Sequence, residues 1–443
     1  MAKSELRGVS VQRPPTVVVT PTTNILRTFT RVARKNNEVV RIRSPLFEFY
    51  LVSDPRLIQE ILVTQHKSFI KGEFLQRTKK VFGEGLLTSE GDFHHRQRRL
   101  VQPAFHSTRI ASYVDTINGY TDHVTGAWKE GQVLDLHSEM TKLTMEVIAK
   151  CLFNEDVESQ ASEISRSLTD IIEYFSRLSS PFAWLLEKLP SNRKYENAIK
   201  TVDKMIYGMI ADRKKSGRDY GDLLSMLLSA RDADGSMMTD QQLRDEALIL
   251  FSAGHETTAN ALTWTWYLVS KHPEVEEKLH EEVDSLLQGK RKPNYEDVPK
   301  LGYTTKVFTE SMRVFPPAWV LPRQPIEDCN IGGYLIPANV QVLMSQYVVH
   351  HDPRYFAEPE NFNPDRWTKD MTSKLPKFAY FPFGGGPRSC VGEPFAWMEG
   401  VLVLARIASG WKMSLDPKQK VELLPRITLR PKYGMRMKLS KRN

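Results

Sequence analysis

The sequence predicts a mainly α-helical fold with a smaller β region. Apolar residues recur with helical spacing through several segments, the longest of which runs for about 30 residues from Thr239 to Pro273. Segments that resemble strands are short and few. No linker, low-complexity tract or internal repeat divides the 443 residues. We therefore expect a single domain over residues 1–443, with residues 1–25 as a poorly ordered leader.

The composition excludes several classes of protein. A hydrophobic content of 41% is ample for a large globular core. The cysteines, Cys151, Cys329 and Cys390, are odd in number and far apart, which argues against a disulfide framework and a zinc site. No signal peptide and no apolar run of membrane-spanning length is evident, so we expect a cytoplasmic protein without a transmembrane anchor. A net charge of +8 could attract nucleic acid, but the basic clusters are short and no nucleic acid partner is expected.

The first elements are a strand pair and a capped helix. Glu38–Arg43 and Phe47–Val52 are rich in β-branched and aromatic residues and flank a Ser-Pro turn. Asp54 then supplies an N-cap and Pro55 the first helical position. A glycine-broken apolar segment follows, and we expect it to form a flexible lid.

Helices predominate from this point. The next segment places His94 and Arg98 four residues apart, on one face of a helix. Helical periodicity continues over residues 136–153 and 164–178, and an apolar connection, residues 181–186, follows the second of these helices. The helix that starts at the capping box of Thr239 would be roughly 45 Å long at 1.5 Å per residue.

The middle of this long helix, Ala253–Thr258, contains a glycine and two threonines, which are poor helix formers. Such a local conflict is typical of functional sites. Gly254 would leave room for a small ligand, while a carboxylate and a hydroxyl could relay protons. A bend in which threonine hydroxyls bond to the preceding turn is the structural alternative.

The C-terminal third begins with a helix from about Leu301 to Phe315. Its Glu310 and Arg313 form an i,i+3 pair, which contributes only about 0.2–0.5 kcal/mol if exposed. Strands are expected around residues 333–344, and a hairpin is expected around residues 426–431.

A single cysteine, Cys390, lies in a glycine-rich turn just before an apolar helical run. A helix N-terminus favours a thiolate, which is a good iron ligand. Arg388 offers a cation for a haem propionate. A buried structural cysteine is the alternative. A phosphate-binding loop is excluded because no Gly-Lys-Ser/Thr follows the glycines.

This turn resembles the F-x-x-G-x-R-x-C-x-G pattern of the cytochromes P450, the haem-thiolate monooxygenases, through Phe383, Gly386, Arg388, Cys390 and Gly392. The resemblance implies a cytochrome P450 fold, with haem b (iron protoporphyrin IX) between the long central helix and the cysteine loop. It implies that Cys390 ligates the iron and that Phe383, Arg388 and Gly392 lie at the cofactor.

The resemblance extends to three further motifs. The segment from Ala253 matches (A/G)-G-x-(D/E)-T, which implies that Ala253 lies at the haem and that Glu256 and Thr257 are the acid–alcohol pair that delivers protons for O–O cleavage. The family's buried E-x-x-R triad would comprise Glu310, Arg313 and Arg366, with a role in fold integrity. Propionate contacts are implied for His94, Arg98 and Arg323. A substrate pocket is implied for Phe82, Leu86, Leu87, Ala318, Trp319, Val320 and Ile427, with residues 181–186 at its entrance.

The implied activity is insertion of one oxygen atom from O₂ into a small apolar organic substrate, by hydroxylation or epoxidation. Because no flavin or nicotinamide motif is present, electrons are expected from a separate ferredoxin, flavodoxin or flavoprotein reductase. A monomer is expected. A peroxide-driven peroxygenase and a non-catalytic haem sensor or carrier remain as alternatives.

Overall fold

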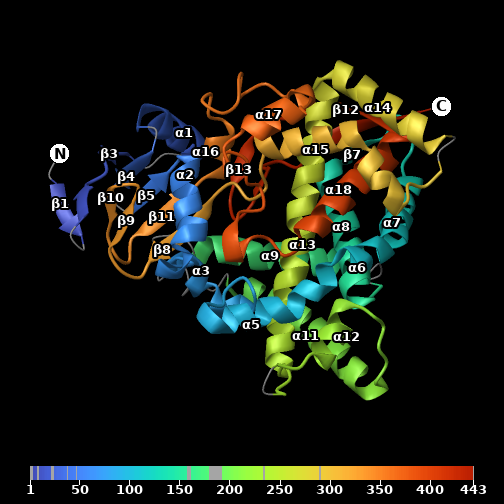
Figure 1. Ribbon diagram of the computed structural model, residues 1–443. Coiled ribbons are helices and arrows are strands. Elements are labelled where there is room, and N and C mark those ends of the chain that lie inside the picture. The colour runs from blue at the N-terminus through green and yellow to red at the C-terminus, as the bar shows by residue number, and fades with distance from the viewer. Residues whose placement is uncertain are drawn as a thin grey trace. The chain divides into compact units, whose positions relative to one another are not determined.

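The computed structural model describes residues 3–6, 9–20, 24–36, 38–45, 47–156, 161–178, 192–232, 235–288 and 291–442. The chain divides into two compact units (Figure 1). The sheet unit contains the described residues up to Arg77 and from Met312 to Cys390. The helical unit contains Thr78–Leu178, residues 192–311 and the chain from Val391 onward.

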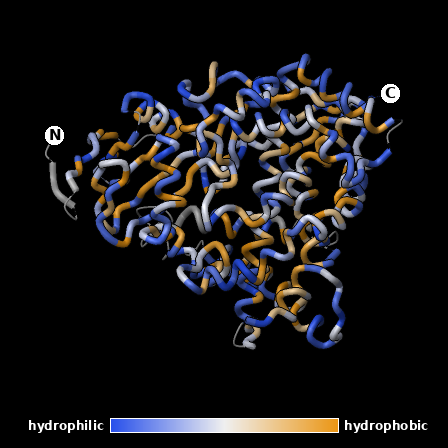
Figure 2. Tube along the Cα trace, viewed as in Figure 1, coloured by the Kyte–Doolittle hydropathy of each residue, from blue (hydrophilic) through white to orange (hydrophobic). Residues whose placement is uncertain are grey.

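The sheet unit is built on a six-stranded sheet with the order β3-β4-β5-β11-β8-β6. β4 and β5 pair antiparallel, with Val40 opposite Leu51, which confirms the predicted strand pair. β11 then pairs parallel with β5, so two segments far apart in sequence lie side by side, blue beside orange in Figure 1. Figure 2 shows that β4, β5 and β11 are largely hydrophobic. The strands are β3 (Thr16–Val18), β4 (Val39–Arg43), β5 (Glu48–Val52), β6 (Phe69–Ile70), β8 (Leu321–Pro325) and β11 (Gln341–Met344).

A second, four-stranded sheet has the order β1-β2-β10-β9. Its strands are β1 (Lys3–Leu6), β2 (Val9–Gln12), β9 (Cys329–Ile331) and β10 (Tyr334–Ile336). The predicted leader thus contributes strands, and β2 meets β10 where Gln12 lies opposite Tyr334.

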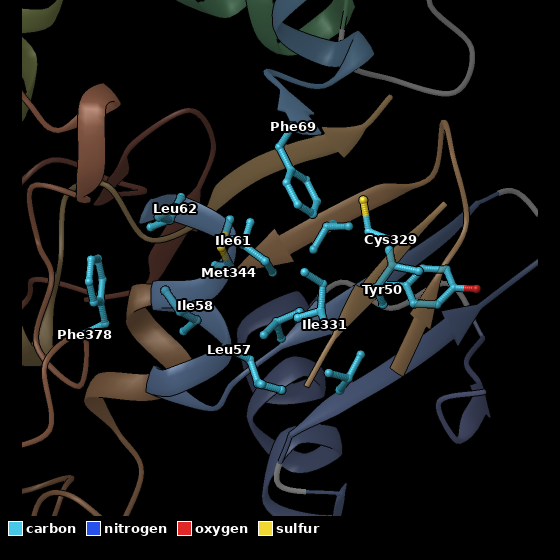
Figure 3. Packing of buried hydrophobic residues seen from close by; sticks show 14 of the residues in the cluster. Tyr50, Leu57, Ile58, Ile61, Leu62, Phe69, Cys329, Ile331, Met344 and Phe378 are labelled. Carbon is cyan, nitrogen blue, oxygen red and sulfur yellow. The ribbon is translucent and has the colours of Figure 1, made fainter. Parts of the chain in front are cut away.

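The core of the sheet unit forms under helix α2 (Pro55–Gln59). Asp54 caps this helix by accepting a hydrogen bond from the Arg56 amide, as its sequence predicts. The chain continues as the π-helix η1 (Glu60–Thr64), which keeps Ile58 and Ile61 on the buried face. Figure 3 shows this face packed with Ile331, Met344 and their neighbours.

Shorter helices complete this unit. They are α1 (Ile25–Asn36), η2 (His66–Ser68), α3 (Glu73–Arg77), α16 (Gln346–His350), η7 (Pro364–Arg366), α17 (Lys369–Lys374) and η8 (Gly386–Arg388). Helix α15 (Gly302–Val314) ends in it.

The helical unit is organised around α13 (Asp240–Lys271), a helix of 32 residues. Thr239 and Gln242 form the predicted capping box. Helix α8 (Leu136–Phe153) has the predicted bounds and packs along α13. A Cβ at Gly254 would lie 2.7 Å from Cδ1 of Ile148 on α8. Gly254 is therefore required for close packing of two helices, which is a different reason from the predicted space for a ligand.

The remaining helices of this unit are α4 (Lys79–Phe82), α5 (Gly91–Val101), η3 (Gln102–Phe105), α6 (Ser107–Ser112), α7 (Val114–Gly126), α9 (Ala161–Leu178), α11 (Arg193–Ser216), α12 (Leu223–Ser229), α14 (Pro273–Leu287), η6 (Tyr295–Lys300) and α18 (Glu393–Ala408). Its strands are β7 (Val133–Asp135), β12 (Trp411–Leu415), β13 (Leu423–Pro425), β14 (Leu429–Pro431) and β15 (Arg436–Lys441). β13 and β14 form the predicted hairpin, and β12, β15 and β7 form a three-stranded sheet. Among the described residues, no helix combines the length and the apolar character that crossing a bilayer requires.

Candidate functional site

The cysteine loop occupies the end of the sheet unit. The amide of Cys390 donates to the carbonyl oxygen of Phe383 at 3.0 Å and closes the turn around η8. Cys390 is exposed and takes part in no disulfide. Gly392, two residues later, is the N-cap of α18. Cys390 therefore precedes the N-terminus of a helix by a few residues in the chain, as the sequence predicts.

The protein's own packing explains the glycines of this loop. A Cβ at Gly385 would lie 2.2 Å from the ring of Phe378. Gly386 has φ +70°, and a Cβ there would lie 2.0 Å from the carbonyl oxygen of Leu62 in η1. Both positions exclude a side chain. Contacts within the protein itself therefore fix the loop against η1.

The predicted cations are distributed over both units. Arg323, on β8, is buried, and its Nη1 donates to the carbonyl of Pro322 at 2.8 Å. Arg388 is half-buried in η8. On α5 of the helical unit, His94 is buried and Arg98 is half-buried, one turn apart.

Both kinds of group that a haem needs are therefore present. An exposed thiol on a fixed loop is a suitable axial donor for iron, and arginines suit propionate oxygens. Beside His94, the buried amide of Gln97 has no hydrogen-bond partner within the described part of the chain. Helix α5 therefore also offers a buried polar group to a ligand. These residues fit the cofactor that the resemblance implies.

The centre of α13 places the predicted acid and alcohol in different surroundings. Oγ1 of Thr257 donates to the carbonyl of Ala253 at 2.8 Å, which is the back-bonding considered as an alternative. Oε1 of Glu256 instead accepts from Oγ1 of Thr428, on the turn between β13 and β14, at 2.6 Å. Adjacent residues on a helix do not face each other. Glu256 and Thr257 are therefore neighbours in sequence whose side chains bond to different partners within the described part of α13 and the hairpin.

Exposure along α13 also separates two faces. Ala253 is exposed and Thr257 is half-buried, although most residues around them are buried. His255 points elsewhere: its Nδ1 lies 2.9 Å from the carbonyl oxygen of Phe251, and burial lowers the pKa of its imidazole. A neutral, buried His255 is a core residue of the helical unit.

The predicted structural triad lies at the end of α15 and in the segment after α16. Glu310 and Arg313 are fully buried. Arg313 donates to the carbonyl oxygens of His350, Pro359 and Asn361 at 2.7–2.9 Å. Arg366 also reaches Asn361, at 3.1 Å. Two arginines thus fix the backbone of one loop of the sheet unit, which suits a structural role.

The predicted flexible lid is held by α13. The amide of Glu84 donates to Oδ2 of Asp245 at 2.9 Å, and the amide of Leu86 donates to Oε2 of Glu246 at 3.0 Å. Phe82 and Leu86 are buried, and Leu87 is half-buried. The segment has an apolar surface, but two carboxylates of one helix anchor its backbone.

The other predicted pocket residues fall in several places. Trp319 is buried, and the centroid of its ring lies 6.3 Å from that of Phe29 in α1. Trp319 is therefore a core residue. Ala318, Val320 and Ile427 are half-buried. The predicted entrance, residues 181–186, lies outside the described residues.

Sequence reasoning missed the partners of Glu256. Thr428 bonds to it, and Nη1 of Arg430 lies 3.9 Å from its Oε1. Both are more than 170 residues from Glu256, and a Thr-x-Arg pair on a hairpin has no distinctive spacing. No pattern in the sequence could have indicated this contact.

Comparison with known proteins extends these findings. The cytochrome P450 family profile matches residues 16–438. Cyclooctatin synthase of Streptomyces melanosporofaciens is 40% identical over 399 residues, covering 89% of this chain and 87% of the relative. Cyclooctat-9-en-7-ol 5-monooxygenase of the same organism is 35% identical, with coverage of 86% and 84%. Pentalenene oxygenase of Streptomyces avermitilis is 31% identical, with coverage of 92% and 91%.

Solved structures agree in fold. The crystal structure of the cytochrome P450DA heme domain superimposes with a TM-score of 0.88 at 24% identity, covering 98% of each chain. A second cytochrome P450 crystal structure gives a TM-score of 0.86 at 23% identity, with 97% of this chain covered. The predicted fold class is confirmed. The chain therefore belongs to the cytochrome P450 family, and it is a haem-dependent monooxygenase.

Proposed function

We propose that Cys390 is the thiolate ligand of the haem iron. The observation that supports this most directly is the exposed thiol on a turn fixed by Gly386 and by the hydrogen bond from the Cys390 amide to Phe383. The positive end of α18 favours the ionised sulfur. Bound haem supplies the oxygen-activating chemistry, and thiolate ligation favours O–O cleavage. The chain's own residues hold the cofactor, exclude water and deliver protons.

Carbon monoxide tests the ligand assignment. The reduced holoprotein with carbon monoxide should give the red-shifted Soret band of thiolate ligation, and Cys390→Ser should lose this shift. Cys329→Ser, which changes a cysteine in the core of the sheet unit, is the matched control and should retain it. A red-shifted band in Cys390→Ser would overturn the assignment.

Glu256 and Thr257 are proposed as the proton-delivering pair. The hydroxyl of Thr257 can give up its bond to the Ala253 carbonyl, since a threonine hydroxyl is both donor and acceptor. Glu256 supplies the carboxylate at the same level of α13. Thr257→Ala should lower the product formed per electron pair consumed. Unchanged coupling would argue against the pair.

The remaining site residues are proposed to hold the cofactor in place. His94, Arg98, Arg323 and Arg388 would bind the propionates, while Ala253, Phe383 and Gly392 would lie against the porphyrin. Glu310, Arg313 and Arg366 are proposed to maintain the surrounding fold, because the two arginines fix carbonyl oxygens of one loop.

The substrate is proposed to be an unsaturated cyclic hydrocarbon or its alcohol, as in terpene chemistry. Pentalenene and cyclooctat-9-en-7-ol, in the names of two relatives, are by nomenclature an alkene and an unsaturated alcohol. The apolar residues Phe82, Leu86, Leu87 and Ile427 suit such a ligand. A spectral-shift titration with cyclic terpenes and with fatty acids tests this proposal. A shift with fatty acids alone would contradict it.

A separate electron donor is proposed for this enzyme, since monooxygenases of the cytochrome P450 family need electrons from a redox partner. A ferredoxin, a flavodoxin or a flavoprotein would each meet the chemical requirement. A monomeric state and a cytoplasmic location stay predictions.

A further inference from the structure

A chain of hydrogen bonds ends on the carboxylate of Glu256. Oγ1 of Thr428 donates to Oε1 of Glu256 at 2.6 Å. Nδ2 of Asn260, one turn further along α13, donates to Oγ1 of Thr428 at 3.3 Å. Nε2 of His137, in the first turn of α8, lies 3.1 Å from Oδ1 of Asn260. All four residues belong to the helical unit.

The chemistry of these groups fixes the direction of the chain. An amide oxygen only accepts, so Nε2 of His137 must carry the proton that it shares with Asn260. An amide nitrogen only donates, so the Thr428 hydroxyl accepts from Asn260 and directs its own proton to Glu256. All three donors therefore point along the chain toward the carboxyl group, which accepts through Oε1.

The charged groups around these hydrogen bonds favour the same direction of donation. Arg430, on β14, places Nη1 3.9 Å from Oε1 of Glu256. Burial lowers the pKa of His137, and the Arg430 charge adds to that effect, whereas Asp135 and Glu256 act in the opposite direction. His137 is therefore held largely as a neutral donor. Glu256, Asn260 and Thr428 are all buried, so water competes little for these bonds.

We propose that Thr428 is a positioning residue for Glu256, and that the turn between β13 and β14 thereby controls where the proton-delivering carboxylate points. The inference rests on the proposed role of Glu256. The bond to Thr428 ties the carboxyl to the hairpin turn, while the hydroxyl of Thr257 bonds along its own helix. Release of Glu256 from the turn then frees the carboxyl group to reorient for proton delivery. Ile427 precedes Thr428 on this turn, so a substrate that touches Ile427 would act on the same release.

Three variants test the proposal. Thr428→Val keeps the shape of the side chain and removes the donor, whereas Thr428→Ser keeps the donor. Thr265→Val is the matched control, because this buried hydroxyl on α13 bonds to the Ala261 carbonyl of its own helix. We expect Thr428→Val to change product yield per electron pair at least threefold, with substrate affinity within twofold of the parent. Thr428→Ser should restore the parent value, and Thr265→Val should leave it unchanged.

A second measurement does not depend on turnover. The urea midpoints of the holoproteins are compared in a cycle of Thr428→Val and Glu256→Gln. We expect the loss caused by Thr428→Val to shrink at least twofold in the Glu256→Gln background, because the carboxyl group that accepts from Thr428 is gone. Additive midpoints, or a Thr428→Val enzyme that couples like its parent, would overturn the positioning role.

The two measurements also separate this inference from the proposed function. If Glu256→Gln couples electrons to product normally, the proton-delivering role of Glu256 fails. The urea cycle then decides the Thr428 contact by itself, since it reports the hydrogen bond and not the chemistry.

Discussion

Glu399 is a buried carboxyl group on α18 that no part of the proposed chemistry uses. Burial raises its pKa to about 8, and the nearby Thr258 hydroxyl on α13 offsets this only in part. Its side chain is completely buried. At neutral pH the folded protein therefore carries this carboxyl group in its protonated form, which costs stability relative to the ionised group of the unfolded chain.

The pH dependence of stability tests this state. The unfolded carboxyl ionises near pH 4.5 and the folded one near pH 8, so the folded state binds the extra proton and stability falls as pH rises through this window. Glu399→Gln removes the titration. The free energy of unfolding of this variant, relative to that of the parent, should rise by about 1.4 kcal/mol for each pH unit across the window. Urea midpoints at several pH values measure this, with the exposed Glu277→Gln as control. A difference independent of pH would contradict the prediction.

Gly386 is a second residue whose replacement should change the free energy of unfolding. Its φ of +70° disfavours any side chain, and the Leu62 carbonyl oxygen occupies the position of a Cβ. Gly386→Ala should lower the free energy of unfolding by more than about 1 kcal/mol, because strain and a steric clash add. Gly410→Ala is the control, since no atom lies within 4 Å of its Cβ position. Equal urea midpoints for the two variants would show that the loop is not fixed by η1.

At the scale of elements, the segment from Gly83 to Ser89 depends on α13. Asp245 accepts the Glu84 amide through a charge-assisted hydrogen bond, which typically contributes about 1.5–3 kcal/mol. Asp245→Ala should therefore raise amide hydrogen exchange in this segment at least tenfold. Gln241→Ala removes a side chain that bonds to the other oxygen of this carboxylate, and it should leave exchange unchanged. An equal rise in both variants would place the effect in α13 itself.

Elements with local signals were predictable from the sequence. The capping box of Thr239 set the start of α13, and the helical periodicity set the bounds of α8. The sheet of β12, β15 and β7 was not predicted, because its strands are distant in sequence and their pairing is decided by packing. The π-helix η1 was also missed, since its apolar spacing resembles that of an α-helix.

At the scale of the whole molecule, net charge bears on the electron donor. A chain with a charge of +8 should attract an acidic partner. Raising ionic strength shortens the Debye length from about 10 Å at 0.1 M to about 3 Å at 1 M. Reconstituted turnover with an acidic ferredoxin should therefore fall with salt, while the substrate-induced spectral shift, which needs no partner, should persist. Turnover that is indifferent to salt would exclude electrostatic docking.

The candidate site was predictable where its residues belong to contiguous sequence motifs. Cys390 and Glu256 were singled out from their neighbours in sequence, and their roles stay predictions within the family that the profile shows. The partner of Glu256 was not identified, because Thr428 meets it only through the folding of a distant hairpin. The packing neighbours of two glycines were not predicted either: Gly254 and Gly386 face Ile148 and Leu62, and neither neighbour could be inferred from local spacing.

The six-stranded sheet has a consequence for synthesis on the ribosome. β5 ends at Val52, and its parallel partner β11 begins at Gln341, so about 290 residues must be added before that edge is paired, which takes roughly 15–60 s at about 5–20 residues per second. Throughout this interval the nascent chain presents an apolar strand edge, a known template for aggregation. Slow translation or a missing C-terminal segment should therefore make this protein depend on chaperones that shield nascent chains.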